Sequence, residues 1–204
     1  MLVDKSVSEL LRAFSSTEPT PGGGSASALA SAIGASLLIM VAGLPKTRTN
    51  APEERTALQD ASNQIAALRE HLAAAIDADT AAYDRVVAAY RMPKASSDEQ
   101  AARQAAIQAA LRGATDVPLD VMRWSTRALE HAVAVARHGL SSAASDVSVG
   151  VALLKAGATG ARLNVDVNVG SVKDLSYADA VRSETQQLSE AIERLGASAS
   201  AVQP

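Results

Sequence analysis

The stretch that most constrains this chain is an uncharged helical run that follows a triple glycine near the N-terminus. Pro19-Thr-Pro-Gly-Gly-Gly24 excludes regular structure, because proline fixes its φ angle and glycine opens conformations closed to other residues. From Ser25 to Leu44 no residue is charged and every residue tolerates a helix. Ser25 is suited to cap this helix, whose free N–H groups would face an anion. We therefore predict a glycine hinge that leads into a buried helix, although a simple tight turn explains the same glycines.

The predicted helix is apolar on every side, which requires burial in protein or lipid. Small residues recur along it at three- and four-residue spacing, at Ser27, Ala30, Ser31, Gly34 and Ala35. Its length suffices to cross a bilayer, but serine and alanine dilute its hydrophobicity and no second such segment exists. We expect a central helix of a soluble bundle and no membrane span. Its small-residue face also suits a partner helix across a symmetric dimer.

Composition narrows the class of protein. Aromatic residues make up 2% of the 204 residues and the hydrophobic class 48%, a difference that is mostly alanine, the best helix former. This favours an all-α fold. The absence of cysteine excludes disulfides and cysteine-based metal sites or nucleophiles, and the net charge of −3 offers no footprint for nucleic acid. The first residues lack the apolar core of a signal peptide, so we expect a cytoplasmic protein.

Apolar periodicity and end signals predict further helices. The first is short and amphipathic, over residues 3–14, and a long one runs from about residue 52 to 90. The next begins at a capping box in 96–99, is kinked or restarted by Pro118, and ends at 137–139. Ser141-Ser142 can cap another helix, and the last one ends at Gly196. Residues 1–196 then form one helical domain and residues 197–204 a disordered tail.

Residues 163–169 allow two interpretations. Leu163-Asn-Val-Asp-Val-Asn-Val169 alternates apolar and polar residues with period two, which predicts a strand. As a helix, the same segment places Asn164 and Asn168 on one face.

The most informative irregularity lies in the predicted helix over residues 52–90. Its apolar stripe runs to Ile76 and resumes at Tyr83, and the position expected between them holds Asp79. An unpaired carboxylate on a buried seam is costly, so this group needs a partner. Asp77 and Asp84 lie on an adjoining face, which gathers three acids in one place. A break in the helix near Asp77, with all three acids in solvent, is the alternative.

Several short motifs follow one another along the chain. They are Pro-Thr-Pro-Gly-Gly-Gly-Ser at 19–25, Asp-Ala-Asp-Thr-Ala-Ala-Tyr-Asp at 77–84, Tyr-Arg-Met-Pro-Lys at 90–94, Val-Pro-Leu-Asp-Val-Met-Arg at 117–123, Ala-Arg-His-Gly at 136–139, Ala-Ser-Asp at 144–146 and Leu-Asn-Val-Asp-Val-Asn at 163–168. Taken in this order, they resemble the cyclodeaminase/cyclohydrolase family, which includes the cyclodeaminase domain of formiminotransferase-cyclodeaminase and bacterial methenyltetrahydrofolate cyclohydrolases. The resemblance covers about residues 7–181.

This chain departs from the family in two places. Leu140-Ser-Ser142 stands where the family usually has Asn-Pro-Asn, and Pro45-Lys-Thr-Arg48 replaces a Gly-Lys-Lys type of basic run. If the Asn-Pro-Asn turn touches the substrate, the first departure bears on activity or on the choice of substrate.

The resemblance implies an all-α fold of long antiparallel helices in a bundle, a coiled-coil-like homodimer interface, and folate sites near that interface. It also favours the helical interpretation of residues 163–169, because a lone strand would lack partners for its backbone groups. The implied activity is formimidoyltetrahydrofolate cyclodeaminase, which releases ammonia, or methenyltetrahydrofolate cyclohydrolase. Neither reaction needs a metal or any cofactor beyond the tetrahydrofolate substrate.

Carboxylate chemistry suits both reactions, because each passes through a tetrahedral carbon between nitrogens, with positive charge in the neighbouring species. We predict that Asp79 is the general acid/base and that Asp77 or Asp146 orients it or binds the amino-pterin. Asp146 is equally well explained as a dipole partner at a helix start.

The predicted substrate-binding set centres on the triple glycine. Together with Lys46 and Arg48 it would hold the anionic tail of a folate, which can be polyglutamylated, although a solvated loop also explains both cations. The full set is Gly22, Gly23, Gly24, Ser25, Lys46, Arg48, Tyr83, Asp84, Asn164 and Asn168.

A different class of function is also open at this point. The protein would then be a non-catalytic helical dimer that binds folate, or only another protein. The loss of the family's Asn-Pro-Asn turn fits this alternative.

Overall fold

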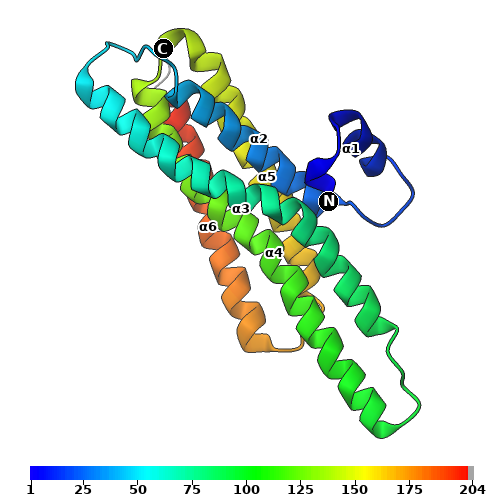
Figure 1. Ribbon diagram of the computed structural model, residues 1–204. Coiled ribbons are helices and arrows are strands. Elements are labelled where there is room, and N and C mark those ends of the chain that lie inside the picture. The colour runs from blue at the N-terminus through cyan, green and yellow to red at the C-terminus, as the bar shows by residue number, and fades with distance from the viewer. Residues whose placement is uncertain (202–204) are drawn as a thin grey trace.

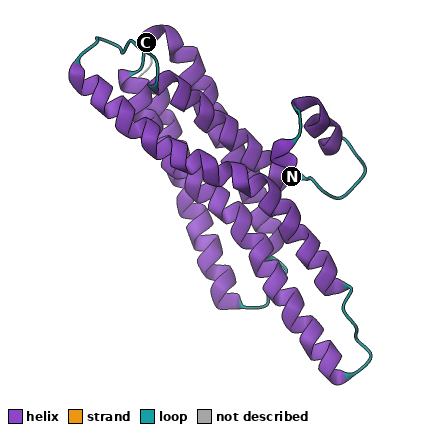
Figure 2. Ribbon diagram, in the orientation of Figure 1, coloured by secondary structure: helices purple, strands orange, loops and turns teal. Residues whose placement is uncertain are grey.

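Long helices make up nearly all of the protein in the computed structural model, which describes residues 1–201 (Figures 1 and 2). Four of them pack around a shared core: α2 (Gly23–Ala42), α3 (Pro52–Tyr90), α4 (Ser97–His138) and α5 (Ala144–Val169). α6 (Leu175–Ala201) packs on α4 and α5. The short elements are η1 (Leu2–Asp4), α1 (Val7–Phe14) and η2 (Ser141–Ala143), and residues 1–201 contain no strand, as the all-α prediction requires.

The start of α2 differs from the prediction. Gly22 is the N-cap and the helix begins at Gly23, so Ser25 lies in the first turn and does not cap it. Ser141 and Ser142 likewise form a short 3-10 turn, and no side chain caps α5. In both places the backbone begins the helix without the serine hydroxyl that the sequence offers.

Pro118 neither breaks nor restarts α4, which runs unbroken through it. A proline inside a helix has no N–H, so the carbonyl four residues earlier loses its helical donor. That carbonyl belongs to Ala114, and the Asn168 side chain of α5 donates to it through Nδ2 at 2.7 Å. The strand interpretation of residues 163–169 is therefore wrong, and the helix that replaces it supplies the group that Pro118 removes.

The predicted disordered tail is wrong for residues 197–201, which continue α6. Gly196 does not end the helix. It packs against Lys155 of α5, where a Cβ atom would lie 2.6 Å from the lysine Cδ, and Ala199 beyond it is fully buried. Residues 202–204 lie outside the described residues.

α2 and α5 run antiparallel with their backbones in close contact, because glycines stand where they meet. A Cβ atom at Gly34 would lie 2.6 Å from the Gly150 carbonyl oxygen, and one at Gly157 would lie 2.5 Å from the Ser27 carbonyl oxygen. Among residues 1–201, α2 is the one helix long and apolar enough to cross a membrane, and 56% of that apolar window is buried in the protein. The buried share of α2 agrees with the prediction that it is a central helix of the bundle.

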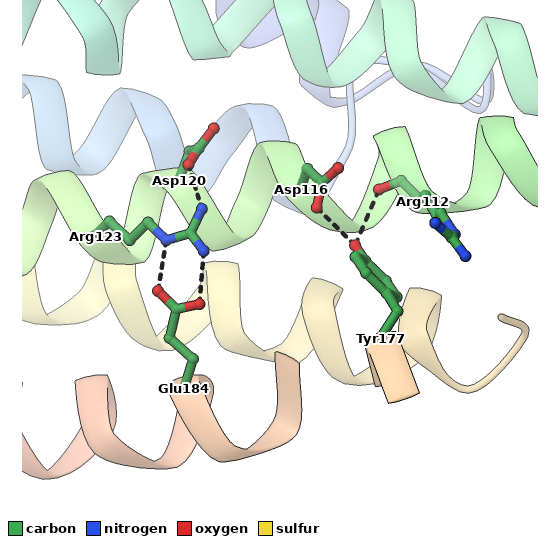
Figure 3. Close-up of polar contacts among 6 residues, drawn as sticks. All are labelled: Arg112, Asp116, Asp120, Arg123, Tyr177 and Glu184. Atoms are coloured by element: carbon green, nitrogen blue, oxygen red, sulfur yellow. Dashed lines mark hydrogen bonds and ion pairs between the residues drawn. The ribbon is translucent and has the colours of Figure 1, made fainter. Parts of the chain in front are cut away.

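Polar contacts fasten α6 to α4 (Figure 3). The Arg123 guanidinium donates to both oxygens of Glu184, each at 2.6 Å, and to Asp120 at 2.8 Å. The Tyr177 hydroxyl donates to Asp116 at 2.6 Å, and burial together with that carboxylate raises the pKa of the phenol. These acids are therefore engaged in holding helices together.

At the N-terminus, Leu2 packs against the core of the bundle, whereas α1 stands apart from it. α1 projects from its side in Figure 1 and buries none of its residues, so its predicted apolar stripe is largely exposed. Asp77 of α3 ties this segment down, since its carboxylate accepts the backbone N–H groups of Leu2 at 2.5 Å and Val3 at 3.4 Å.

Candidate functional site

A pocket of about 290 Å³ opens where the triple glycine meets three long helices. The glycine segment forms one wall, and α3, α4 and α5 supply the others. Its described lining is Pro19, Thr20, Gly22, Gly23, Gly24, Asp79, Ala82, Tyr83, Val86, Leu111, Ala114, Asn164 and Asn168. Asp79 is the one charged side chain in this set.

The Asp79 carboxylate is held by the first turn of α2. Its Oδ2 atom accepts the Ser25 backbone N–H at 2.8 Å and lies 2.9 Å from the Ser25 hydroxyl. That hydroxyl is also 2.9 Å from the Ile76 carbonyl oxygen, and its single proton can serve either acceptor. The anion predicted at the start of α2 is thus a residue of the chain itself, in the position where the helix dipole favours a negative charge.

Gly24 makes this approach possible. A Cβ atom there would overlap the Asp79 carboxylate, with Oδ1 as its nearest atom. Since both contacts from Ser25 go to Oδ2, Oδ1 remains beside the glycine segment for a bound molecule. The glycine at this position serves a close approach, and the backbone there is ordinary helix.

Two amides of α5 complete the polar lining. The Nδ2 atom of Asn164 donates to the Gly160 carbonyl at 2.9 Å, and that of Asn168 donates to Ala114. Their Oδ1 atoms are left as acceptors on the lining of the pocket. Tyr83, 41% exposed, adds an aromatic ring to the same lining. The structure thus brings together Gly22, Gly23, Gly24, Ser25, Asp79, Tyr83, Asn164 and Asn168 from the predicted set.

The structure does not bring Asp77 and Asp84 to this pocket. Asp77 holds the N-terminal segment, as described above, and Asp84 is exposed and absent from the lining. Both acids therefore lie outside the pocket of a single chain, and the predictions that Asp77 orients Asp79 or binds the amino-pterin and that Asp84 binds substrate stay predictions. The reason is helical geometry, because each residue turns the side chain by about 100°.

Lys46, Arg48 and Asp146 lie at the opposite end of the bundle. α2 has 20 residues, so about 30 Å separates the triple glycine from the loop that follows Ala42. In that loop the Arg48 guanidinium donates to the Ala136 carbonyl at 2.8 Å, and Lys46 is exposed. Asp146, in the first turn of α5, is about 27 Å along the helix from Asn164. Within one chain these three residues lie apart from the triple glycine and from Asp79, and the roles predicted for them stay predictions.

That opposite end has a polar network of its own, centred on Glu54. The buried Glu54 carboxylate accepts the Thr47 hydroxyl at 2.6 Å and the Thr49 backbone N–H at 2.9 Å, and these hydrogen bonds hold its pKa at about 2. His138 lies 4.0 Å away at the end of α4. The network orders the loop after α2, where a smaller cavity of about 140 Å³ lies beside Thr47 and Asn50.

Residues from the middle of α4 and from α3 were missed by the sequence analysis. Leu111 and Ala114 line the pocket from α4, and Ala82 and Val86 continue the face of α3 that begins at Asp79. Spacing of three and seven residues from Asp79 could have found the α3 pair. Nothing local marks the α4 pair, because they reach the pocket through packing alone.

Comparison with known proteins gives consistent similarities. Over residues 6–187 the chain matches the formiminotransferase-cyclodeaminase family. It is 37% identical over 179 residues to the methenyltetrahydrofolate cyclohydrolase of Methylorubrum extorquens, covering 88% of this chain and 86% of that protein. It is 28% identical over 187 residues to the formimidoyltransferase-cyclodeaminase of Gallus gallus, covering 92% of this chain and 34% of that relative. The chain thus spans about a third of the longer relative.

The fold also has a solved counterpart. A formiminotetrahydrofolate cyclodeaminase from Thermotoga maritima superposes with a TM-score of 0.87 over 99% of this chain and 97% of that chain, at 22% identity. At this identity the likeness concerns the fold.

Proposed function

The chain belongs to the formiminotransferase-cyclodeaminase family, and we propose from this that its pocket binds tetrahydrofolate carrying a methenyl-level carbon. The protein is a folate one-carbon enzyme, either a cyclodeaminase or a methenyltetrahydrofolate cyclohydrolase. We favour the cyclohydrolase, because the relative of that name is 37% identical and is matched along 86% of its length.

The hydrolysis forms one carbon–oxygen bond and breaks one carbon–nitrogen bond. Water adds to the methenyl carbon, which shares a positive charge with its two nitrogens, and loses a proton. The bond from that carbon to one nitrogen then breaks, the hydroxyl proton of the intermediate is transferred to that nitrogen, and formyl-tetrahydrofolate is left. A carboxylate near the carbon stabilises the cation and accepts the proton from water. In cyclodeamination the same group would deliver a proton to the departing ammonia.

Asp79 is the residue we assign to this role, and its position carries the proposal. Among the described residues that line the pocket it alone is charged, and Gly24 and Ser25 fix its orientation. With Oδ2 held by Ser25, Oδ1 is available to the attacking water. Asn164 and Asn168 would accept hydrogen bonds from the donor groups of the pterin, and Tyr83 would pack against a flat ring of the ligand.

We further propose that the enzyme acts in the cytoplasm as a homodimer, with a tetrahydrofolate derivative as its small-molecule partner and no added cofactor. A single helical domain suffices for this chemistry, because one pocket holds every assigned group.

Replacing Asp79 by asparagine tests the assignment. Loss of a general acid/base lowers turnover by roughly two to four orders of magnitude, so Asp79→Asn should lose at least about a hundredfold in kcat. The assay follows the methenyl absorbance with methenyl-tetrahydrofolate and, separately, with formimino-tetrahydrofolate, which also decides between the two activities.

Asp60→Asn is the matched control, because Asp60 is an exposed acid on the same helix and should leave turnover unchanged. Circular dichroism establishes that both variants are folded. Turnover of a folded Asp79→Asn within about threefold of the parent would refute the assignment. Binding of methenyl-tetrahydrofolate by the unmodified protein without loss of its absorbance would favour the non-catalytic alternative.

A further inference from the structure

A cavity nearly as large as the glycine-lined pocket lies between α3 and α4. Its volume is about 280 Å³, and its described lining comes from these two helices alone. The two cavities share no residue of their described linings. Ala67, which lies in this cavity, precedes Asp79 by about 18 Å along α3. The cavity is therefore separate from the site assigned to folate.

The register of the two helices gives this cavity the shape of a slot. His71 of α3 stacks on Trp124 of α4, with ring centroids 5.1 Å apart and planes inclined by 16°. α3 and α4 form an antiparallel hairpin (Figure 1), so Gln64 and His131, two helical turns away from the stacked rings, lie at one level. The stacked pair thus forms one end of the slot and the second pair the other, about 10 Å apart.

A small side chain keeps the slot open. Ala67 lies between the two ends on α3, and a larger side chain there would take up much of the volume. Leu68 beside it is 8% exposed and belongs to the core, so the floor is apolar. Trp124 is half-buried and packs against the same core while it lines the slot. The aromatic wall is therefore held in place by the bundle.

The polar groups along the slot have no protein partners. Within residues 1–201, no hydrogen bond or ion pair engages the Arg127 guanidinium, the His131 imidazole or the indole N–H of Trp124. Glu130, the single carboxylate of the described lining, is unpaired as well. A guanidinium and an imidazole that converge on one cavity suit an oxyanion, because both donate N–H groups, the imidazole in either protonation state.

Other arginines of α4 hold helices together. Arg123 donates to Glu184 (Figure 3) and Arg112 pairs with Asp174, so both fasten α6 or the turn before it to α4. Arg127 follows Arg123 by one turn and lines the slot instead. No contact between helices accounts for its charge, which leaves a ligand as its role.

The ligand that suits these groups combines a flat ring with an anionic oxygen group. The aromatic wall favours a planar ring, because offset and edge-to-face contacts between rings are favourable. Arg127 and His131, in the middle and at the far end of the slot, favour a phosphate or carboxylate. Glu130 can accept a proton from a hydroxyl or amino group. The volume is near the lower end of small-molecule sites, roughly 300–1,000 Å³, which suits a mononucleotide.

We propose that the slot between residues 64–71 of α3 and 124–131 of α4 is a second binding site, which takes a nucleoside monophosphate. Its base lies against Trp124 and its phosphate on Arg127 and His131. The proposal does not rest on the folate activity, because no residue of this site lines the folate pocket.

The fluorescence of the unmodified protein tests this site directly, because the chain contains a single tryptophan. Titration with adenosine monophosphate should change the tryptophan emission and should saturate, with a Kd below about 1 mM. Equilibrium dialysis with the same nucleotide should give one nucleotide bound per chain. Neither measurement requires folate or turnover.

Fragments of the nucleotide separate the ring from the anion. Adenosine lacks the phosphate and ribose 5-phosphate lacks the base, so each leaves one end of the slot unfilled. Each should bind at least about tenfold more weakly than adenosine monophosphate. Inorganic phosphate or ribose 5-phosphate that binds as tightly as the nucleotide would remove the ring from the site and overturn the nucleotide assignment.

Two substitutions with matched controls locate the binding. Ala67→Leu fills the slot and should abolish binding, whereas Ala81→Leu, exposed on the same helix outside the lining, should leave it unchanged. Arg127→Gln removes the charge and should weaken binding by roughly ten- to a hundredfold. Arg137→Gln, an exposed arginine further along α4, should have no effect.

Two results would overturn the proposal. One is the absence of binding by both fluorescence and dialysis up to about 5 mM nucleotide. The other is binding that persists at full strength in both Ala67→Leu and Arg127→Gln, which would place the nucleotide elsewhere on the protein. A protein that binds the nucleotide in the slot but turns over neither folate substrate would keep this site and lose the proposed function.

Discussion

At the scale of single residues, Gly24 decides whether Asp79 can face the pocket. A methyl group at this position would overlap the carboxylate, so Gly24→Ala should displace it while the helix persists. Misplacing a catalytic group by about 1 Å costs on the order of a hundredfold in rate, and we expect a loss of this size in kcat.

The control for this substitution is Gly113→Ala in α4, where a Cβ atom meets nothing within 4 Å. This variant should keep full activity and gain up to about 1 kcal/mol of stability from helix propensity. Equal activity of the two variants in steady-state assays would show that the carboxylate does not depend on the space at Gly24.

The sequence pointed to the position of Asp79 beside the triple glycine but not to which residues share its pocket, for one reason. An acid that interrupts an apolar stripe is marked by the pattern itself, and the triple glycine marks a close approach. Whether Asp77 and Asp84 share the pocket depends on rotation about the helix, and they point elsewhere. Lys46 and Arg48 were predicted to join the glycines because cations suit the anionic tail of a folate. That argument takes no account of the 20-residue helix α2 that separates them.

At the scale of helices, Asn168 compensates for Pro118. The Ala114 carbonyl has no helical donor, and Asn168→Leu would leave it unsatisfied in the protein interior. An unpaired buried acceptor costs about 1–3 kcal/mol, and the free energy of unfolding in urea should fall by this amount.

A double-mutant cycle isolates the effect. In a Pro118→Ala background the backbone N–H at position 118 is restored and can donate to the Ala114 carbonyl. Asn168→Leu should then lower the free energy of unfolding clearly less than it does with Pro118 present. Asn164→Leu is the comparison, because its target, the Gly160 carbonyl, already has the α5 backbone as donor. Equal costs for Asn168→Leu in both backgrounds would contradict the compensation.

The helices themselves were largely predictable and their exceptions were not. Proline and capping-box signals placed the starts of α3 and α4 correctly. Continuity through Pro118 depends on a donor from α5, more than 40 residues later, which no local pattern reveals. The alternation in 163–169 arises because Val165 and Val169 are buried on one side of α5 while Leu163 and Val167 are exposed on the other. Only the family resemblance favoured a helix there.

At the scale of the whole molecule, stability should depend on pH through Glu54. Its pKa is about 2 in the folded protein against 4.5 for a free glutamate, so its hydrogen bonds stabilise the fold fully above about pH 4.5. This contribution is lost as pH falls through the folded value. The difference in unfolding free energy between the parent and Glu54→Gln should be largest near neutral pH and should shrink between about pH 4.5 and 2.

Urea unfolding at several pH values measures this difference. Glu53→Gln changes the adjacent exposed acid in the same helical turn and serves as the control. A difference between parent and Glu54→Gln that stays constant down to pH 2 would mean that the carboxylate contributes no charge-dependent stability.

The projecting α1 gives the chain a part whose opening is independent of the bundle. It contributes no buried residue to the core, and the carboxylate of one distant residue holds the segment before it. Its local unfolding therefore requires little free energy and exposes none of the core. Amide protons of residues 7–14 would exchange with solvent long before those of α2, so truncation up to the hinge would remove an appendage and leave the pocket wall in place.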